Sequence, residues 1–238
     1  MKDTEIMTDK TDKYEVSIYC LAYNHERFIR NTLESIINQK TNFAYKVIVH
    51  DDASTDGTAD IIREYAGKYP DIIFPVYQKE NQYSQHIDIF ANYIVPLLEG
   101  KYLAVCECDD MWIDSDKLQI QYDYMSSNPD CSMCVHETKI IDVEGNDLGR
   151  NFNNSEISRD YETDEIIDTG GGGLFHTSSF FERTEYRLAV PDVFSVKGVG
   201  DYPLSIWFSL CGRIHYINRC MSAYRFNVPG SWTSRNAQ

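Results

Sequence analysis

The sequence predicts an α/β fold in which a largely parallel sheet carries helices on both faces. Short apolar runs of strand length alternate with segments whose apolar residues recur at helical spacing. Polar clusters follow several of the apolar runs, as expected where strands end at a ligand site. With 238 residues, of which 42% are hydrophobic, the chain is long enough for one large domain with its own core.

The first two units each join a strand to a helix. Residues 16–22 form an apolar run, and apolar positions at helical spacing follow over residues 29–37. A second apolar run, 47–49, leads into a turn over residues 53–57, after which Thr58 is placed to cap a helix. Repetition of this unit favours parallel strand pairing.

Two further strands extend the pattern. Residues 72–76 are predicted to form a strand that Pro75 breaks, and residues 87–98 a helix interrupted near Pro96. Residues 102–106 form the fourth apolar strand. Because the carboxyl ends of parallel strands share one edge of a sheet, three polar clusters are expected to meet there. These clusters are Tyr23-Asn24, Asp51-Asp52 and the acidic turn from Glu107 to Asp110.

The remainder of the chain shows a weaker pattern. Helices are expected over residues 117–125 and 202–210, and short strands over 131–135 and 214–217. No composition shift marks a linker, so one domain of two halves is expected to follow a loose tail over residues 1–13.

The charge balance limits the possible ligands. Twenty-two basic and 37 acidic residues give a net charge of −15, which repels phosphate backbones and disfavours nucleic-acid binding. A bound phosphate is expected to need a metal ion as mediator.

The seven cysteines are expected to be reduced thiols of a cytoplasmic protein, because their number is odd and no signal peptide precedes them. Cys131 and Cys134 form a lone C-x-x-C, interpreted as core thiols and not as a zinc site. No window is long and apolar enough for a membrane span, which leaves peripheral membrane association open.

The strongest local signal is the acidic group Glu107, Asp109 and Asp110 directly after an apolar strand. Three carboxylates at a sheet edge repel one another unless a cation neutralises them, and a hard divalent ion takes oxygen ligands together with substrate phosphates. The alternative is a solvated acidic turn that caps the helix after Trp112.

Asp51 and Asp52 form the second acidic cluster, where a carboxylate could accept hydrogen bonds from a nucleobase or ribose. The stretch from Asp52 imitates the start of a calcium loop, but Arg63 stands at its twelfth position, so a calcium site is rejected. Asp56 and Thr58 could be turn and cap residues only.

Two segments of the second half each allow two interpretations. The run 170–173 fits no phosphate-binding motif and is expected to be a loop near a site or a plain linker, while residues 176–179 could contact a polyhydroxyl ligand or begin a strand. Asp201, at the start of a helical run, is either a helix-terminal cap or an exposed general base.

Four stretches, taken together, resemble a family 2 nucleotide-sugar glycosyltransferase of the GT-A fold, of the type that builds bacterial surface polysaccharides. They are residues 16–29, residues 47–58, residues 100–112 with 116–118, and residues 200–204 ahead of 221–225, and the resemblance covers about residues 14–226. It implies a nucleotide-sugar-binding half over residues 14–113, and an acceptor-binding and catalytic half over residues 114–238 of the same domain.

The resemblance also assigns roles to residues of the first half. Tyr23 should stack on the base, and Asp52 should hydrogen-bond it with Asp51 as support. Glu107-Cys108-Asp109 occupies the place of the family's acidic D-x-D motif.

The resemblance likewise implies that Asp109 and Asp110 are ligands of Mn²⁺ or Mg²⁺. Which of the two is the main metal ligand stays open. Asp201 matches the family's catalytic base. Two departures are that Asn227 stands where many relatives have a histidine, and that Gly200-Asp201 replaces an acidic pair.

The resemblance therefore implies an inverting, metal-dependent glycosyltransferase with a UDP-sugar donor and a saccharide or lipid-linked saccharide acceptor, at the inner face of the membrane. Rival hypotheses are a nucleotide-sugar or glycan-binding protein without turnover, and a nucleotidyltransferase, for which no basic triphosphate loop is visible.

Overall fold

The computed structural model describes residues 13–153, 155–169, 174–194, 200–229 and 234. Its strands are β1 (Val16–Ala22), β2 (Tyr45–Asp51), β3 (Ile73–Tyr77), β4 (Tyr102–Val105), β5 (Met111–Trp112), β6 (Cys131–Ile141), β7 (Asp147–Phe152), β8 (Arg159–Tyr161), β9 (Phe181–Arg183) and β10 (Arg213–Arg225). Its α-helices are α1 (Ile29–Ile37), α2 (Thr58–Lys68), α3 (Lys117–Ser127), α4 (Thr163–Asp168), α5 (Thr184–Leu188) and α6 (Asp201–Cys211). The predicted α/β fold is confirmed.

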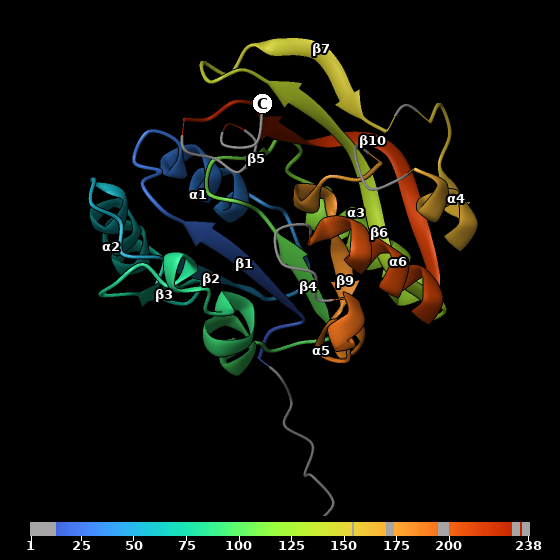
Figure 1. Cartoon of the computed structure of the whole chain (residues 1–238), viewed down its shortest axis with the longest axis horizontal. Coiled ribbons are helices and arrows are strands. Elements are labelled where there is room, and N and C mark those ends of the chain that lie inside the picture. The colour runs from blue at the N-terminus through green and yellow to red at the C-terminus, as the bar shows by residue number, and fades with distance from the viewer. Residues whose placement is uncertain (1–12, 154, 170–173, 195–199, 230–233, 235–238) are drawn as a thin grey trace, which may run out of the picture.

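The strands pair in the order β3-β2-β1-β4-β9-β6-β10-β5, with β7 added to β6 and β8 to β10. The pairs β3-β2, β2-β1, β1-β4 and β6-β10 are parallel, whereas β9 runs antiparallel to both β4 and β6. Figure 1 shows β2, β1 and β4 side by side at the centre of the molecule. Their carboxyl ends therefore lie at one edge, as predicted.

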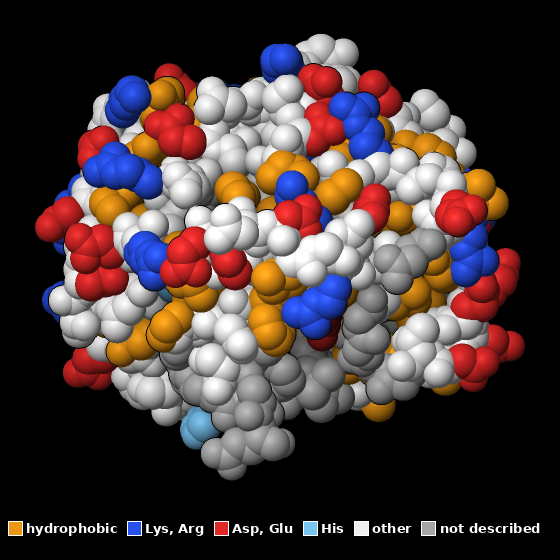
Figure 2. Space-filling model, turned by 90° about the horizontal axis from the view of Figure 1, so that it is seen from above, with side chains coloured by type: hydrophobic (Ala, Val, Ile, Leu, Met, Phe, Trp, Pro, Cys, Tyr) orange, Lys and Arg blue, Asp and Glu red, His pale blue; other side chains and the backbone are white. Residues whose placement is uncertain are grey.

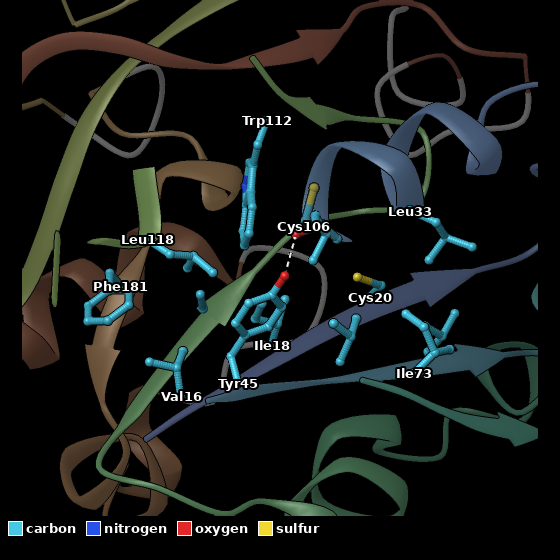
Figure 3. Packing of buried hydrophobic residues seen from close by; sticks show 14 of the residues in the cluster. Val16, Ile18, Cys20, Leu33, Tyr45, Ile73, Cys106, Trp112, Leu118 and Phe181 are labelled. Atoms are coloured by element: carbon cyan, nitrogen blue, oxygen red, sulfur yellow. Dashed lines mark hydrogen bonds between the residues drawn. The ribbon is translucent and has the colours of Figure 1, made fainter. Parts of the chain in front are cut away.

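Alternating strand residues build a core on each face of the sheet. On one face, which we call the α1 face, buried residues of β1, β2 and β4 pack with residues of α1, α2 and α3, including Leu33, Ile62 and Leu118. Figure 3 shows this packing around Val16 and Ile18. On the opposite face, which we call the α6 face, other residues of the same strands pack with α4 and α6.

Three predicted elements differ in the structure. β3 runs through Pro75 and is not broken by it, because β3 lies at the sheet edge, where a missing amide hydrogen costs no ladder bond. Residues 87–98 hold a π-helical turn, η2 (Phe90–Ile94), and a 3₁₀ turn, η3 (Val95–Leu97), instead of an α-helix. Residues 177–179 form a 3₁₀ turn, η4 (Thr177–Ser179), and not a strand start.

One buried hydrogen bond joins the strand β2 to the helix α1. The hydroxyl of Tyr45 donates to the carbonyl oxygen of Ile36 at 2.9 Å, as the dashed line in Figure 3 shows. Burial raises the pKa of Tyr45 to about 12, so the hydroxyl stays protonated as a donor.

Tyr45→Phe is expected to lower the free energy of unfolding by about 1 kcal/mol, because the ring packing is kept and the hydrogen bond is lost. Chemical denaturation measures this change. A loss below about 0.3 kcal/mol would show that the Ile36 carbonyl, which also accepts from the Gln39 amide, needs no second donor.

All seven cysteines are free thiols, and Cys131 and Cys134 are fully buried, as predicted for core residues. No helix in the described part of the chain is long and apolar enough to cross a membrane. The face drawn in Figure 2 carries Lys and Arg side chains interspersed with Asp and Glu.

Candidate active site

The carboxyl ends of β1, β2 and β4 are joined by main-chain hydrogen bonds. The amide of Asp52 donates to the carbonyl of Ala22 at 2.9 Å, and the amide of Cys108 donates to Leu21 at 3.3 Å. The three polar clusters after these strands are thereby brought together, which confirms the predicted convergence.

Tyr23 lies in a tightly fixed loop after β1. Its side chain is 40% exposed at the sheet edge. The next residue, Asn24, has a left-handed backbone with φ of 57°; its amide donates to Ser54 Oγ at 2.9 Å, and its Oδ1 accepts from the Thr55 amide at 2.8 Å. An exposed ring in a loop tied at both sides is suited to stacking on a flat ligand.

Asp52 is buried, and its carboxylate organises a segment that the sequence analysis did not connect to the site. Oδ1 accepts from the Gln82 amide at 2.7 Å, and Oδ2 from the Tyr83 amide at 3.0 Å. Asp51 is also buried, and its Oδ1 accepts from the Ser54 amide at 3.3 Å. Both carboxylates therefore fix loops at the sheet edge, and the segment at Gln82 and Tyr83 carried no motif that could have revealed this role.

The turn after β2 confirms part of its predicted role. Asp56 Oδ1 accepts from the Thr58 amide at 3.0 Å, as a turn residue does. Thr58 does not cap α2: it is the first helical residue after the N-cap Gly57, and its Oγ1 accepts from the His25 amide at 2.8 Å.

A side chain of helix α1 anchors the acidic turn that follows β4. Thr32 Oγ1 donates to the carbonyl oxygens of Cys108 and Asp110 at 3.0 and 2.6 Å. Burial, together with the nearby charge of Asp109, raises the pKa of Glu107 to about 8. The turn does not cap α3, which begins at Lys117 without a side-chain cap.

Asp109 and Asp110 point to different neighbours. The carboxylate of Asp109 lies 3.9 Å from Nε2 of His25, in the loop after β1. The carboxylate of Asp110 is buried: Oδ1 accepts from the Arg225 amide at 2.9 Å, and Oδ2 lies 3.7 Å from Nδ1 of His176. Asp110 Oδ2 has no hydrogen-bond partner among the described residues.

Arg225 at the end of β10 fixes the acidic turn from the other side. Its Nε donates to the carbonyl of Asp109 at 3.0 Å, and its Nη1 donates to Asp142 and Val143 at the β6-β7 turn. With Arg27 it lines a hollow of about 290 Å³. Arg225 had no predicted role, because its burial and its contacts with the acidic turn appear only in the folded chain.

Asp201 is the first residue of α6, so its predicted place at a helix start is confirmed. The N-cap is Gly200, and Asp201 Oδ1 accepts from the adjacent Tyr202 amide at 3.1 Å. The helix packs on β6 and β10, beside α4. Residues 170–173 and 195–199 lie outside the described residues, so the glycine-rich run and the approach to Asp201 are not placed.

Among the described residues, no group of three His, Cys, Asp or Glu side chains forms a site for a metal ion by itself. The carboxylates of the acidic turn nevertheless fit a hard divalent ion that takes one or two protein ligands and completes its shell with phosphate oxygens. Asp110 Oδ2, buried and without a partner, adds a further unsatisfied oxygen beside Asp109.

These features define an α/β domain whose polar clusters meet at one edge of the sheet, and comparison with known proteins gives the family. The sequence model described as glycosyl transferase family 2 matches residues 17–184. The chain belongs to this family.

Curated relatives are similar over most of the chain. The uncharacterized protein Rv1520 of Mycobacterium tuberculosis is 31% identical over 92% of this chain and 61% of its own length. The putative teichuronic acid biosynthesis glycosyltransferase TuaG of Bacillus subtilis is 27% identical over 88% of this chain and 78% of its own length. The chain spans about three fifths of the length of the mycobacterial relatives it matches.

Solved structures establish the GT-A fold. Residues 1–349 of TarS from S. aureus, in complex with UDP-GlcNAc, align with a TM-score of 0.69 and 17% identity over 92% of this chain and 60% of that one. The mannosyltransferase PcManGT of Pyrobaculum calidifontis, in complex with GDP-Man and Mn²⁺, aligns with a TM-score of 0.61 and 18% identity over 98% of this chain and 63% of that one.

Proposed function

We propose that this protein is an inverting, metal-dependent glycosyltransferase that moves a sugar from a UDP-sugar to a hydroxyl of a saccharide or lipid-linked saccharide, in bacterial surface-polysaccharide synthesis at the inner face of the membrane. The observation that carries the proposal is the convergence of Tyr23, Asp52 and the acidic turn at one sheet edge in a family 2 chain.

Residues 14–113 supply the donor half and residues 114–238 the acceptor and catalytic half. Tyr23 stacks on the base at the exposed end of β1. Asp52 hydrogen-bonds the base while its oxygens hold the amides of Gln82 and Tyr83, and Asp51 supports the adjoining loop.

The acidic turn faces the donor diphosphate. Asp109, whose side chain lies toward His25 and the donor half, is the first protein ligand for Mn²⁺ or Mg²⁺, and Asp110 supports the turn from the buried side. Such an ion offsets the negative charge that accumulates on the leaving diphosphate. Glu107, half-buried two residues before Asp109, is a supporting group.

Asp201 serves as the general base. The acceptor hydroxyl oxygen attacks the anomeric carbon opposite the diphosphate; the carbon–oxygen bond to the diphosphate breaks, its electron pair leaves with the phosphate, and Asp201 takes the hydroxyl proton. A single displacement of this kind inverts the anomeric centre.

The affinity for UDP is expected to be at least tenfold higher with Mn²⁺ than with EDTA, because the ion joins the diphosphate to Asp109. Isothermal titration calorimetry measures both affinities. Asp109→Asn should remove most of the difference, whereas Asp123→Asn, which changes an exposed carboxylate on α3, should keep it. Equal affinity under both conditions would contradict the metal role.

A donor-hydrolysis assay separates turnover from binding alone. Release of UDP from a UDP-sugar panel with Mn²⁺ is expected for an enzyme, because water can replace the acceptor hydroxyl at a slow rate. A nucleotide-sugar-binding protein without turnover would bind UDP and release none, and pyrophosphate release from UTP would identify a nucleotidyltransferase.

A further inference from the structure

A group of aromatic side chains lies beside the acidic turn and has no part in the function proposed above. Phe152 ends β7, His176 precedes η4, and Tyr224 lies near the end of β10. The ring centroid of His176 is 4.3 Å from Tyr224 and 5.0 Å from Phe152. All three side chains are half-buried, so each ring keeps part of its surface accessible.

From these contacts we propose that Phe152, His176 and Tyr224 form the surface on which the acceptor saccharide binds. This inference rests on the proposed function, since it concerns the acceptor of that reaction. A pyranose offers a flat C–H face to aromatic rings and hydroxyls to hydrogen-bonding groups at its edge. Ligand sites combine apolar rings with a few placed polar groups in this way.

The position of the rings favours the acceptor over the donor. Asp109 lies toward His25 in the donor half, whereas the next residue, Asp110, lies toward His176, with Nδ1 3.7 Å from Oδ2. The aromatic group therefore adjoins Asp110, whereas Asp109 adjoins the loop after β1 that carries Tyr23 and His25. A saccharide bound there adjoins the donor sugar without occupying the nucleotide site.

His176 supplies the polar group of this surface. Its Nδ1 accepts from the Ser178 amide at 3.2 Å and contacts Ser178 Oγ at 2.8 Å, which assigns the ring proton to Nε2. No hydrogen bond joins Nε2 to another described residue, and an N–H donor at this position suits a sugar hydroxyl.

Two buried polar atoms lie close to His176. Asp110 Oδ2 and His136 Nε2 are buried without hydrogen-bond partners among the described residues. An unsatisfied buried polar atom costs about 1–3 kcal/mol. Such a cost is often retained at sites that bind a ligand or an ordered water, and both atoms border the proposed surface through His176.

The competing explanation is that the rings only fasten β7 to β10. Leucine substitution distinguishes saccharide binding from strand packing, because leucine keeps most of the packing volume and lacks a ring face. We would prepare Phe152→Leu and Tyr224→Leu in the full chain. The matched control is Phe43→Leu, since Phe43 is also half-buried and stacks on Tyr122 at 4.2 Å on the α1 face.

Saturation-transfer NMR with a panel of p-nitrophenyl glycosides, in the presence of UDP and Mn²⁺, measures acceptor binding directly. At least one glycoside is expected to give a signal through its ring protons with the natural chain. Phe152→Leu and Tyr224→Leu should weaken that binding at least fivefold, with Phe152→Tyr restoring it and Phe43→Leu leaving it unchanged.

Three results would overturn the inference: no glycoside signal with the natural chain, full binding in both leucine variants, or an equal loss in Phe43→Leu. UDP affinity is measured on every variant and is expected to stay within twofold. If UDP fails to bind while glycosides bind and the leucine variants lose them, the donor assignment fails and the saccharide surface stands.

Discussion

Asp201→Asn is expected to lower kcat for glycosyl transfer by about 10²–10⁴-fold, because an amide cannot accept the acceptor hydroxyl's proton. Asparagine keeps the size and the hydrogen-bonding oxygen that accepts from the Tyr202 amide, so α6 should begin at the same residue. UDP affinity should stay within twofold, since the proposed donor residues directly follow β1, β2 and β4, away from α6 in the sequence. The test combines steady-state kinetics on the accepted donor with calorimetry for UDP.

The matched control for this substitution is Asp164→Asn. Asp164 is also an aspartate in the first turn of a helix, α4, so it reproduces the change in helix-terminal charge. The control variant is expected to keep the natural turnover and to lose at most about 1 kcal/mol of stability. An unchanged kcat in Asp201→Asn would remove Asp201 from the mechanism and leave it as a helix-terminal charge.

Lys117→Met is expected to raise the free energy of unfolding by about 1–3 kcal/mol near neutral pH, because it removes a buried charge from the core. Lys117 is fully buried at the start of α3, with Nζ 2.7 Å from Gln121 Oε1 and 4.1 Å from the centre of the Trp112 ring. Burial lowers its pKa to about 7, despite the thiols of Cys106 and Cys134 nearby.

The pH dependence provides a second measurement. Between pH 7 and 10.5 the unfolded chain holds the Lys117 proton and the folded chain has lost it, so this residue makes stability rise with pH across that window. Below pH 7 Lys117 is protonated in both states, so the folded chain carries the full free-energy cost of the buried charge. Lys117→Met should flatten the rise.

The exposed Lys40, in the loop after α1, is the control position, and Lys40→Met should leave both the stability and its pH profile unchanged. Denaturant unfolding at pH 6, 8 and 10 supplies the data. Loss of stability in Lys117→Met at pH 6 would mean that the contacts with Gln121 and Trp112 outweigh the cost of burying the charge.

The sequence was sufficient for the parallel part of the fold because its signals are local. Each βα unit from residue 16 to residue 68 shows its own apolar periodicity, and β1 and α1 have the predicted bounds. The prediction that Pro75 breaks its strand was wrong. A proline breaks an interior strand but is tolerated in an edge strand, and which strand lies at the edge depends on the whole sheet.

The candidate site was predictable only in part for the same reason. Tyr23, Asp52 and Asp109 follow strands, so their convergence could be inferred from the order of the strands. The contacts of Gln82 with Asp52 and of Arg225 with the acidic turn join positions 30 and more than 100 residues apart, and no local pattern encodes such pairs.

The hydrogen bond between the Arg225 amide and Asp110 has a consequence for the newly made chain. During synthesis the βα units emerge first, and they can pair while β10 is still inside the ribosome. The acidic turn gains its second anchor only after residue 225 has emerged, so high-affinity nucleotide capture is expected to be a late event in biogenesis. An arrested nascent chain ending before β10 should bind UDP more weakly than one released at full length.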